Sequence, residues 1–142
     1  MSDLSITPAN VKPVNDENFV GKTVTAGGTI TAGKSVYLDT SDAKWKLADA
    51  NASVTTAGKD GLAIALNGAS DGQALEIQTE GDIDIGGTAA LRSVYTVSST
   101  AGGIQPHGDI SAGEYTSIVG LAITTTRLRM AITTADNATV VP

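Results

Sequence analysis

The chain has 142 residues, 16 glycines, no cysteine and a formal net charge of −6. The lack of cysteine excludes disulfide bonds, thiolate catalysis and cysteine-ligated metals, and the acidic charge argues against binding of duplex nucleic acid, which needs a basic face. One domain is the most economical expectation for this length. No apolar run approaches the ~20 residues of a membrane span, and Met1–Ser5 lacks the regions of a signal peptide, so a soluble protein made inside a cell and independent of membranes is expected.

Residues 1–21 are expected to form an extended N-terminal arm. Pro8 and Pro13 fix φ and remove two backbone donors, which makes the segment a poor helix and a poor central strand. Such a terminus can be disordered, or it can become ordered by docking on another chain. For the second case, the expected contacts with a neighbour or a shell are Ile6, Pro8, Val11, Val14 and Phe19.

From residue 22 onward the pattern is typical of β-structure. The clearest signal is a hairpin over residues 35–47, because apolar and polar residues alternate with a period of two on both sides of a polar turn at 40–43. Trp45 and Leu47 share one face of it, which favours a buried tryptophan. Further strands are expected over 61–66, 74–77 and 82–85.

The second half of the chain repeats the first. Ala32–Tyr37 (AGKSVY) recurs as Ala90–Tyr95 (ALRSVY) at an offset of 58, and Gly61–Ile64 (GLAI) recurs at residues 120–123 at an offset of 59. Two copies are too few for a solenoid. Strands are expected over 93–97, 104–106, 114–123 and 127–132, the last with Leu128, Met130 and Ile132 inward and its arginines outward.

No stretch shows the apolar period of a helix. We therefore predict an all-β fold, a small barrel or sandwich. It would be a single β-domain over residues 22–142, built from two pseudo-repeated units at about 22–85 and 86–142.

Residues 28–35 (GTITAGKS) match the phosphate-binding P-loop letter for letter. That loop must follow a buried parallel strand and open a helix whose N-terminus faces the phosphates. Here Ser35 opens a Val-Tyr-Leu strand pattern. The motif is therefore interpreted as a hairpin turn.

The remaining polar features also have plain structural interpretations. The acids between Glu76 and Asp84 alternate along a strand, which is more typical of a solvated face than of a calcium loop. Arg127 and Arg129 either meet an acidic partner surface or are only solvated. His107 is the only histidine, and the chain lacks a Gly-x-Ser-x-Gly elbow. We therefore expect a protein that is not an enzyme and that uses no metal or cofactor.

An ordered set of segments resembles the capsid cement, or head decoration, proteins of tailed bacteriophages. The segments are ITAGKSVYLD (30–39), WKLADA (45–50), GLAIAL (61–66), SVYTVSSTAGGI (93–104) and VGLAI (119–123), with ITPANV (6–11) in the arm. The resemblance covers nearly the whole chain. It implies a structural protein made in the host bacterial cytoplasm that binds the major capsid protein on the exterior of the virion. Such proteins typically form a homotrimer at three-fold positions, and the family offers no catalytic residues.

An alternative is a carbohydrate- or receptor-binding domain of a phage tail or fibre. That function needs an exposed aromatic platform. Tyr37, Trp45, Tyr95 and Tyr115 could form one only if they were exposed and clustered.

Overall fold

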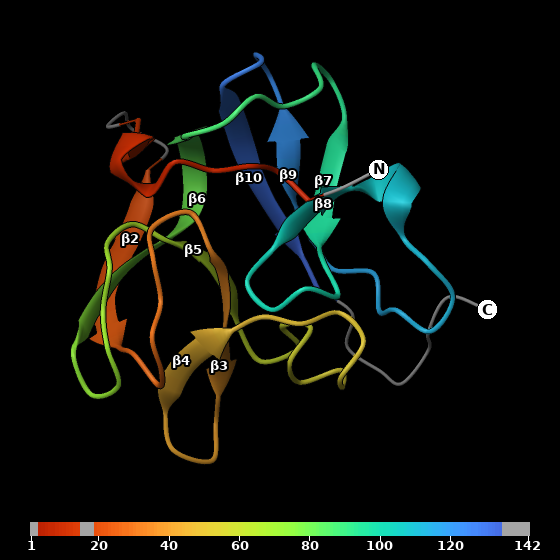
Figure 1. The fold of residues 1–142 in the computed structure, drawn as a ribbon. Coiled ribbons are helices and arrows are strands. Elements are labelled where there is room, and N and C mark those ends of the chain that lie inside the picture. Colours follow the sequence, from red (N-terminus) through yellow and green to blue (C-terminus); the bar gives the residue numbers. More distant parts are fainter. Residues whose placement is uncertain (1–2, 15–18, 135–142) are drawn as a thin grey trace.

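The structure is a computed structural model that describes residues 3–14 and 19–134. The described residues form one sheet of ten strands, which curls into a half-barrel (Figure 1). The elements are η1 (Pro8–Asn10), β1 (Val11–Pro13), β2 (Val20–Thr25), β3 (Ser35–Asp39), β4 (Lys44–Leu47), β5 (Leu62–Ala65), β6 (Ala74–Ile85), β7 (Val94–Val97), β8 (Ile104–Pro106), η2 (His107–Asp109), β9 (Ile118–Ala122) and β10 (Arg127–Thr133). The all-β prediction is confirmed.

The strand order shows the internal repeat. The sheet runs β4-β3-β5-β6-β10-β9-β7-β8, and β1 and β2 pair with the edge of β6 that β5 and β10 leave free. From the centre outward, the first half therefore reads β6, β5, β3, β4 and the second half reads β10, β9, β7, β8. The two long strands β6 and β10 join the halves, because they pair with each other.

The register of strand pairing differs by one residue between the two halves of the sheet. Tyr37 on β3 lies opposite Leu62 on β5, whereas its counterpart Tyr95 lies opposite Gly120 and not opposite Leu121. Because side chains alternate between the faces of a sheet, a shift of one residue moves a side chain to the other face. Leu62 is accordingly 3 % exposed and Leu121 is 37 % exposed.

Strand β6 corrects one prediction. The two short strands expected at 74–77 and 82–85 form a single strand of 12 residues, which bends in the middle. Its pairing with β2 shifts by one residue at Thr79, where one extra residue forms a β-bulge, and Gly81 has a φ of +93° that favours glycine. The buried amide of Gln78 donates from Nε2 to the carbonyl oxygens of Glu80 and Asp82, at 3.0 and 2.8 Å, and so holds the bend.

The bulge lets β6 contribute to two apolar cores on opposite faces of the sheet. Before it, Leu75 and Ile77 pack in a cluster with Trp45. After it, Ile83 and Ile85 pack in a larger cluster, which also contains Tyr37, Leu62, Ile64, Tyr95, Val97 and Leu128. A β-bulge inserts one residue and thereby reverses which side chains face which side.

The hairpin of β3 and β4 contributes Trp45 to the core cluster that contains Leu75 and Ile77. As predicted, Trp45 is buried, at 4 % exposure. The end of β2 reaches β4 through an isolated parallel bridge between Ala26 and Trp45, and the Lys22 ammonium lies 5.5 Å from the centre of the indole ring. The Lys22 ammonium is therefore within the range of a cation–π interaction with the indole ring.

The last two strands of the sheet follow the expected pattern with two differences. Leu128 and Met130 are buried as predicted, but Ile132 is only half-buried. Strand β9 begins at Ile118 and not near Glu114. The Glu114 side chain is buried in the preceding loop, where its carboxylate accepts hydrogen bonds from Gln105 Nε2 at 2.8 Å and from the Ser111 N–H at 3.0 Å.

Candidate interaction surface

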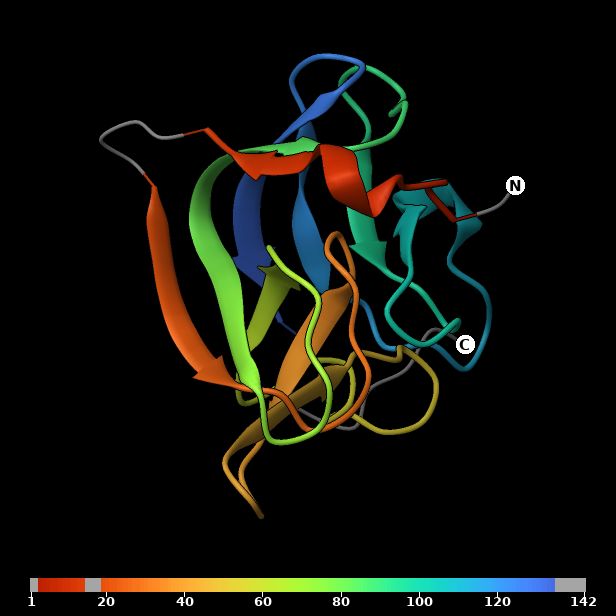
Figure 2. The ribbon, with the colours of Figure 1, turned by 60° about the vertical axis from the view of Figure 1, so that its left-hand side comes forward.

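The described part of the N-terminal arm lies on the β-domain of its own chain. Residues 3–14 cross one end of the sheet (Figure 2). The Leu4 N–H donates to the Ile104 carbonyl and the Thr7 N–H to the Gly86 carbonyl, both at 2.8 Å. β1 then pairs with β6, with Val11 opposite Ile85. The arm is therefore ordered by contacts within the chain.

Two glycines make room for this segment. A Cβ atom on Gly87 would overlap the Ser5 carbonyl oxygen, and one on Gly33 would meet the Ile6 side chain. Close approach of two backbones requires glycine at such positions. Gly33 and Gly87 therefore leave space for the arm on its own β-domain. The sequence pattern of residues 1–21 does not indicate this packing.

The five expected contact residues differ in their surroundings. Val11 is 6 % exposed and belongs to the larger core of its own chain. Ile6 is partly buried against that core, Val14 is half-buried, and Phe19 is half-buried with its ring over Gly21. Pro8 is exposed. Contact of the four accessible residues with another molecule stays a prediction.

Strand β2 is the most exposed strand edge among the described residues. All of its six residues except Val24 are exposed. It pairs with β6 along one side, and the described pairing on its other side is limited to the bridge between Ala26, directly after the strand, and Trp45. It contains no proline and no acidic residue, and the side chain of its single lysine lies over Trp45. Natural proteins usually protect such edges, because an unpaired strand can accept a further strand.

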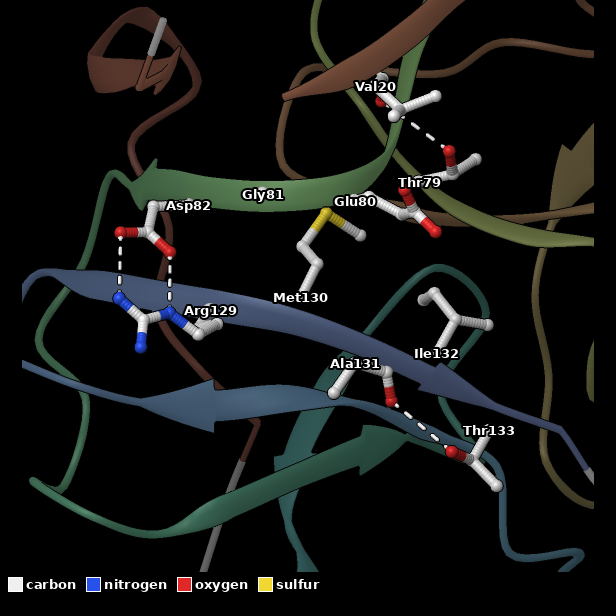
Figure 3. Close-up of a pocket in the computed structure, with 10 residues that line it drawn as sticks. All are labelled: Val20, Thr79, Glu80, Gly81, Asp82, Arg129, Met130, Ala131, Ile132 and Thr133. Atoms are coloured by element: carbon white, nitrogen blue, oxygen red, sulfur yellow. Dashed lines mark hydrogen bonds and ion pairs between the residues drawn. The ribbon is translucent and has the colours of Figure 1, made fainter. Parts of the chain in front are cut away.

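A groove of about 580 Å³ lies beside the bend of β6 (Figure 3). One wall is the bulged part of β6 and the first residue of β2. The other wall is the second half of β10, which has diverged from β6 after the pairing of Ala131 with Glu80. The lining residues are Val20, Thr79, Glu80, Gly81, Asp82, Arg129, Met130, Ala131, Ile132 and Thr133.

The groove combines apolar surface with one unpaired acid. Val20 is 44 % exposed and Ala131 is exposed, and both lie opposite Glu80. The Met130 side chain is directed from β10 toward β6 (Figure 3) but belongs to the core and is only 6 % exposed. Asp82 is neutralised by Arg129, whose Nε lies 3.0 Å from Oδ1. Glu80 is exposed, and the structure shows no ion pair for it among the described residues. A ligand of this groove would be apolar with a cationic group near Glu80.

The arginines of β10 face acids of their own chain. Arg127 lies opposite Asp84 and Arg129 opposite Asp82, with Nε to Oδ1 distances of 2.8 and 3.0 Å. Cross-strand pairs of opposite charge stabilise a sheet modestly when they are exposed. Half of the acidic run on β6 is therefore paired, and neither arginine needs an acidic partner molecule to explain its position.

A further ion-pair cluster lies at the tip of the β3–β4 hairpin. The Lys46 ammonium is 2.7 Å from Asp39 Oδ2 and 3.0 Å from Asp42 Oδ2. Its hydrogen bond holds the pKa of the Asp39 carboxyl well below its usual range, with a smaller effect from Ser41, while the same bond raises the pKa of Lys46. This cluster fixes the hairpin turn.

Among the described residues, the loop between β6 and β7 carries the large apolar side chain with the highest exposed fraction. Leu91 is 54 % exposed, and its neighbour Arg92 is exposed with a φ of +66°, unusual for a residue other than glycine. The Ala89 N–H donates to the Thr125 carbonyl at 2.6 Å and the Arg92 N–H to the Ala122 carbonyl at 2.8 Å, so the loop is held against the end of β9 and the turn that leads to β10. We call Leu91 and Arg92 the tip.

The sequence analysis missed the groove and the tip, although each had a signal. Gly81 interrupts an acidic strand pattern, and an isolated glycine in a strand indicates a bulge. In the internal repeat, Leu91 stands where the first copy has Gly33, so a large apolar residue replaces a turn glycine. The change of offset from 58 to 59 anticipates the register shift that exposes Leu121.

The motifs that suggested chemistry are structural. Ser35 begins β3, and the preceding Gly33 has a φ of +90° with its N–H donating to the Ala65 carbonyl at 2.8 Å, so the P-loop letters form a turn before a strand. His107 is exposed in η2. Within residues 3–14 and 19–134, no group of three or more histidines or acids is arranged to hold a metal ion.

The aromatic side chains do not form a platform in the described residues. Tyr37, Trp45 and Tyr95 are 8 %, 4 % and 1 % exposed, and Tyr95 Oη accepts a hydrogen bond from the Ala90 N–H at 2.7 Å. Tyr115 is half-buried in the loop before β9. Stacking of a sugar ring requires an exposed aromatic face, which these buried rings lack.

No protein-family model and no curated protein sequence matches this chain. Among the described residues, no helix has the length and apolar character needed to cross a membrane.

Proposed function

We propose that this chain is a capsid decoration protein, which binds the outer surface of a phage head through the major capsid protein and stabilises the shell. It acts as a homotrimer at three-fold positions on the exterior of the virion after synthesis in the host cytoplasm. Support comes from the resemblance of its ordered segments to that family and from its all-β fold. A trimer multiplies weak contacts with a repetitive lattice through effective concentration.

The observation that carries the proposal is the open edge of β2. An exposed strand with one free edge is suited to accept an extended segment of another protein, because backbone hydrogen bonds supply affinity and alternate side chains supply selectivity. The buried positions of Tyr37, Trp45 and Tyr95 favour this assembly role over the carbohydrate-binding alternative.

Co-sedimentation with undecorated heads of the parent phage tests the proposal. Purified protein is titrated onto heads, and the copies bound per particle are counted at saturation. We expect saturation at a copy number set by the three-fold positions of the shell. Failure to bind heads, together with binding to host cells or glycans, would favour the tail-domain alternative.

A variant isolates the contribution of β2. The double substitution Thr23→Lys/Thr25→Lys places two lysines on the exposed edge, a device by which natural edge strands resist further pairing. Both side chains are exposed, so the fold should be unchanged. Attachment to heads should weaken about tenfold or more, whereas the matched change Thr88→Lys, at an exposed loop residue, should leave attachment unchanged.

A further inference from the structure

Two surface features of the chain are complementary to each other. The groove beside β6 offers exposed apolar surface from Val20 and Ala131, which both lie directly opposite Glu80 and share its face of the sheet. The tip presents an exposed leucine directly followed by an exposed arginine. Among the described residues, the large apolar side chains that are exposed are Val20, Leu91 and Leu121, so the groove and the tip contain two of the three.

The charges of the groove and the tip are also complementary. Asp82 is already paired with Arg129, which leaves Glu80 as the acid in the groove that lacks a cationic partner among the described residues. No described carboxylate forms an ion pair with Arg92. A leucine bound against Val20 and Ala131 would therefore bring its neighbouring arginine close to Glu80. Desolvated contacts of this kind, with an apolar anchor and a charge at the rim, are typical of protein interfaces.

One chain cannot join its own tip to its own groove. The tip is held against the residues that precede β10, whereas the groove is lined by the second half of that strand. From Arg127 to Ile132 the strand covers roughly 17 Å, at about 3.3 Å per residue. Figure 1 shows the loop between β6 and β7 at the end of the sheet where β10 begins. The contact must therefore join two molecules.

We infer that the groove of one copy of this protein binds the tip of the next copy, with Leu91 in the apolar groove and Arg92 paired with Glu80. The contact uses two different patches and is heterologous, so it generates a closed ring or an open chain of subunits. Ring closure with three subunits rests on the trimer of the proposed function. The inference identifies which surfaces hold that trimer together.

Sedimentation velocity of the full chain, without heads, tests the contact over micromolar to submillimolar concentrations. The wild type should associate, and Leu91→Ala should weaken association about tenfold or more, because the contact would bury a leucine side chain that is 54 % exposed in the single chain. Leu121→Ala is the matched control. It removes another exposed leucine, on the outer face of β9, and should not change association.

Charge exchange provides the decisive variant set. Glu80→Arg and Arg92→Glu each place like charges together, so each single variant should associate several-fold more weakly than the wild type. The double variant Glu80→Arg/Arg92→Glu should recover most of the lost affinity. Because the two residues are far apart within one chain, this recovery reports a contact between molecules and not a change in folding. Unchanged thermal unfolding of each variant verifies the fold.

Three results would overturn the inference. They are a wild type that stays monomeric at all concentrations, equal effects of Leu91→Ala and Leu121→Ala, and no recovery in the double variant. If the groove variants weaken attachment to heads and leave self-association intact, the groove binds the shell and not a second copy. Loss of head binding by a wild type that still trimerises through the tip would instead refute the proposed function and leave this contact standing.

Discussion

Substitution of Val11 tests whether the N-terminal arm packs on its own β-domain or attaches only to another molecule. The Val11 side chain is 6 % exposed in the larger core and lies opposite Ile85 on β6. An arm that attached only to a neighbouring molecule would leave this position exposed in the isolated chain. Substitution of Val11 therefore measures where the arm is seated before any partner is present.

The magnitude follows from the burial. Val11→Ala removes two buried carbon atoms, at about 0.8 kcal/mol for each. The cavity that remains adds a further cost, because the surrounding side chains relax only partly. We expect the free energy of unfolding to fall by about 2 kcal/mol. Pro8→Ala, three residues away at an exposed position, should change the free energy of unfolding by less than about 0.5 kcal/mol.

Urea denaturation of the isolated chain, followed by tryptophan fluorescence, measures both values. Trp45 is a suitable probe because it is buried in the other core cluster and reports global unfolding. The slope of the unfolding free energy with urea should be equal in both variants and the wild type, so that midpoints can be compared. A loss below about 0.5 kcal/mol for Val11→Ala would show that the arm is not seated on its own domain.

Three further predictions concern the bend, the hairpin and the charged ladder. Gly81→Ala should lower the free energy of unfolding by about 1–3 kcal/mol, because its φ of +93° strains any other residue, as urea denaturation would show. Since the pKa of Asp39 is depressed in the folded state, its pairing with Lys46 stabilises the fold above the unfolded pKa of about 4, and this stability is lost as the pH falls through the folded pKa. Asp39→Asn should therefore lose less stability than the wild type between neutral pH and pH of about 3, and an equal loss would contradict this reasoning. Arg127→Gln should cost less than about 1 kcal/mol, and high salt should reduce the difference from wild type, which a salt-independent loss would refute.

The local pattern of the chain determined most of the strands. Alternation around Trp45 and Leu47 predicted the hairpin and its buried tryptophan, and the Val-Tyr-Leu run after Ser35 predicted a strand in place of a P-loop helix. Both predictions depend on neighbours two residues apart, because alternate side chains of a strand face the same side. Repetition of the same segments also anticipated the matching strand orders of the two halves.

Only the tertiary structure decided which residues are available to partners. Two predicted strands form one strand that contains a bulge at Thr79, and the groove lies beside this bulge. Asp82 and Asp84 on this strand pair with arginines of β10, whereas Glu80 has no such partner among the described residues. A register shift of one residue exposed Leu121, although its counterpart Leu62 is buried. Register and bulges arise from pairing between residues far apart in the chain, and a difference of one residue there reverses the faces of a strand. Local periodicity therefore determines that strands form, while long-range pairing determines which surface they present.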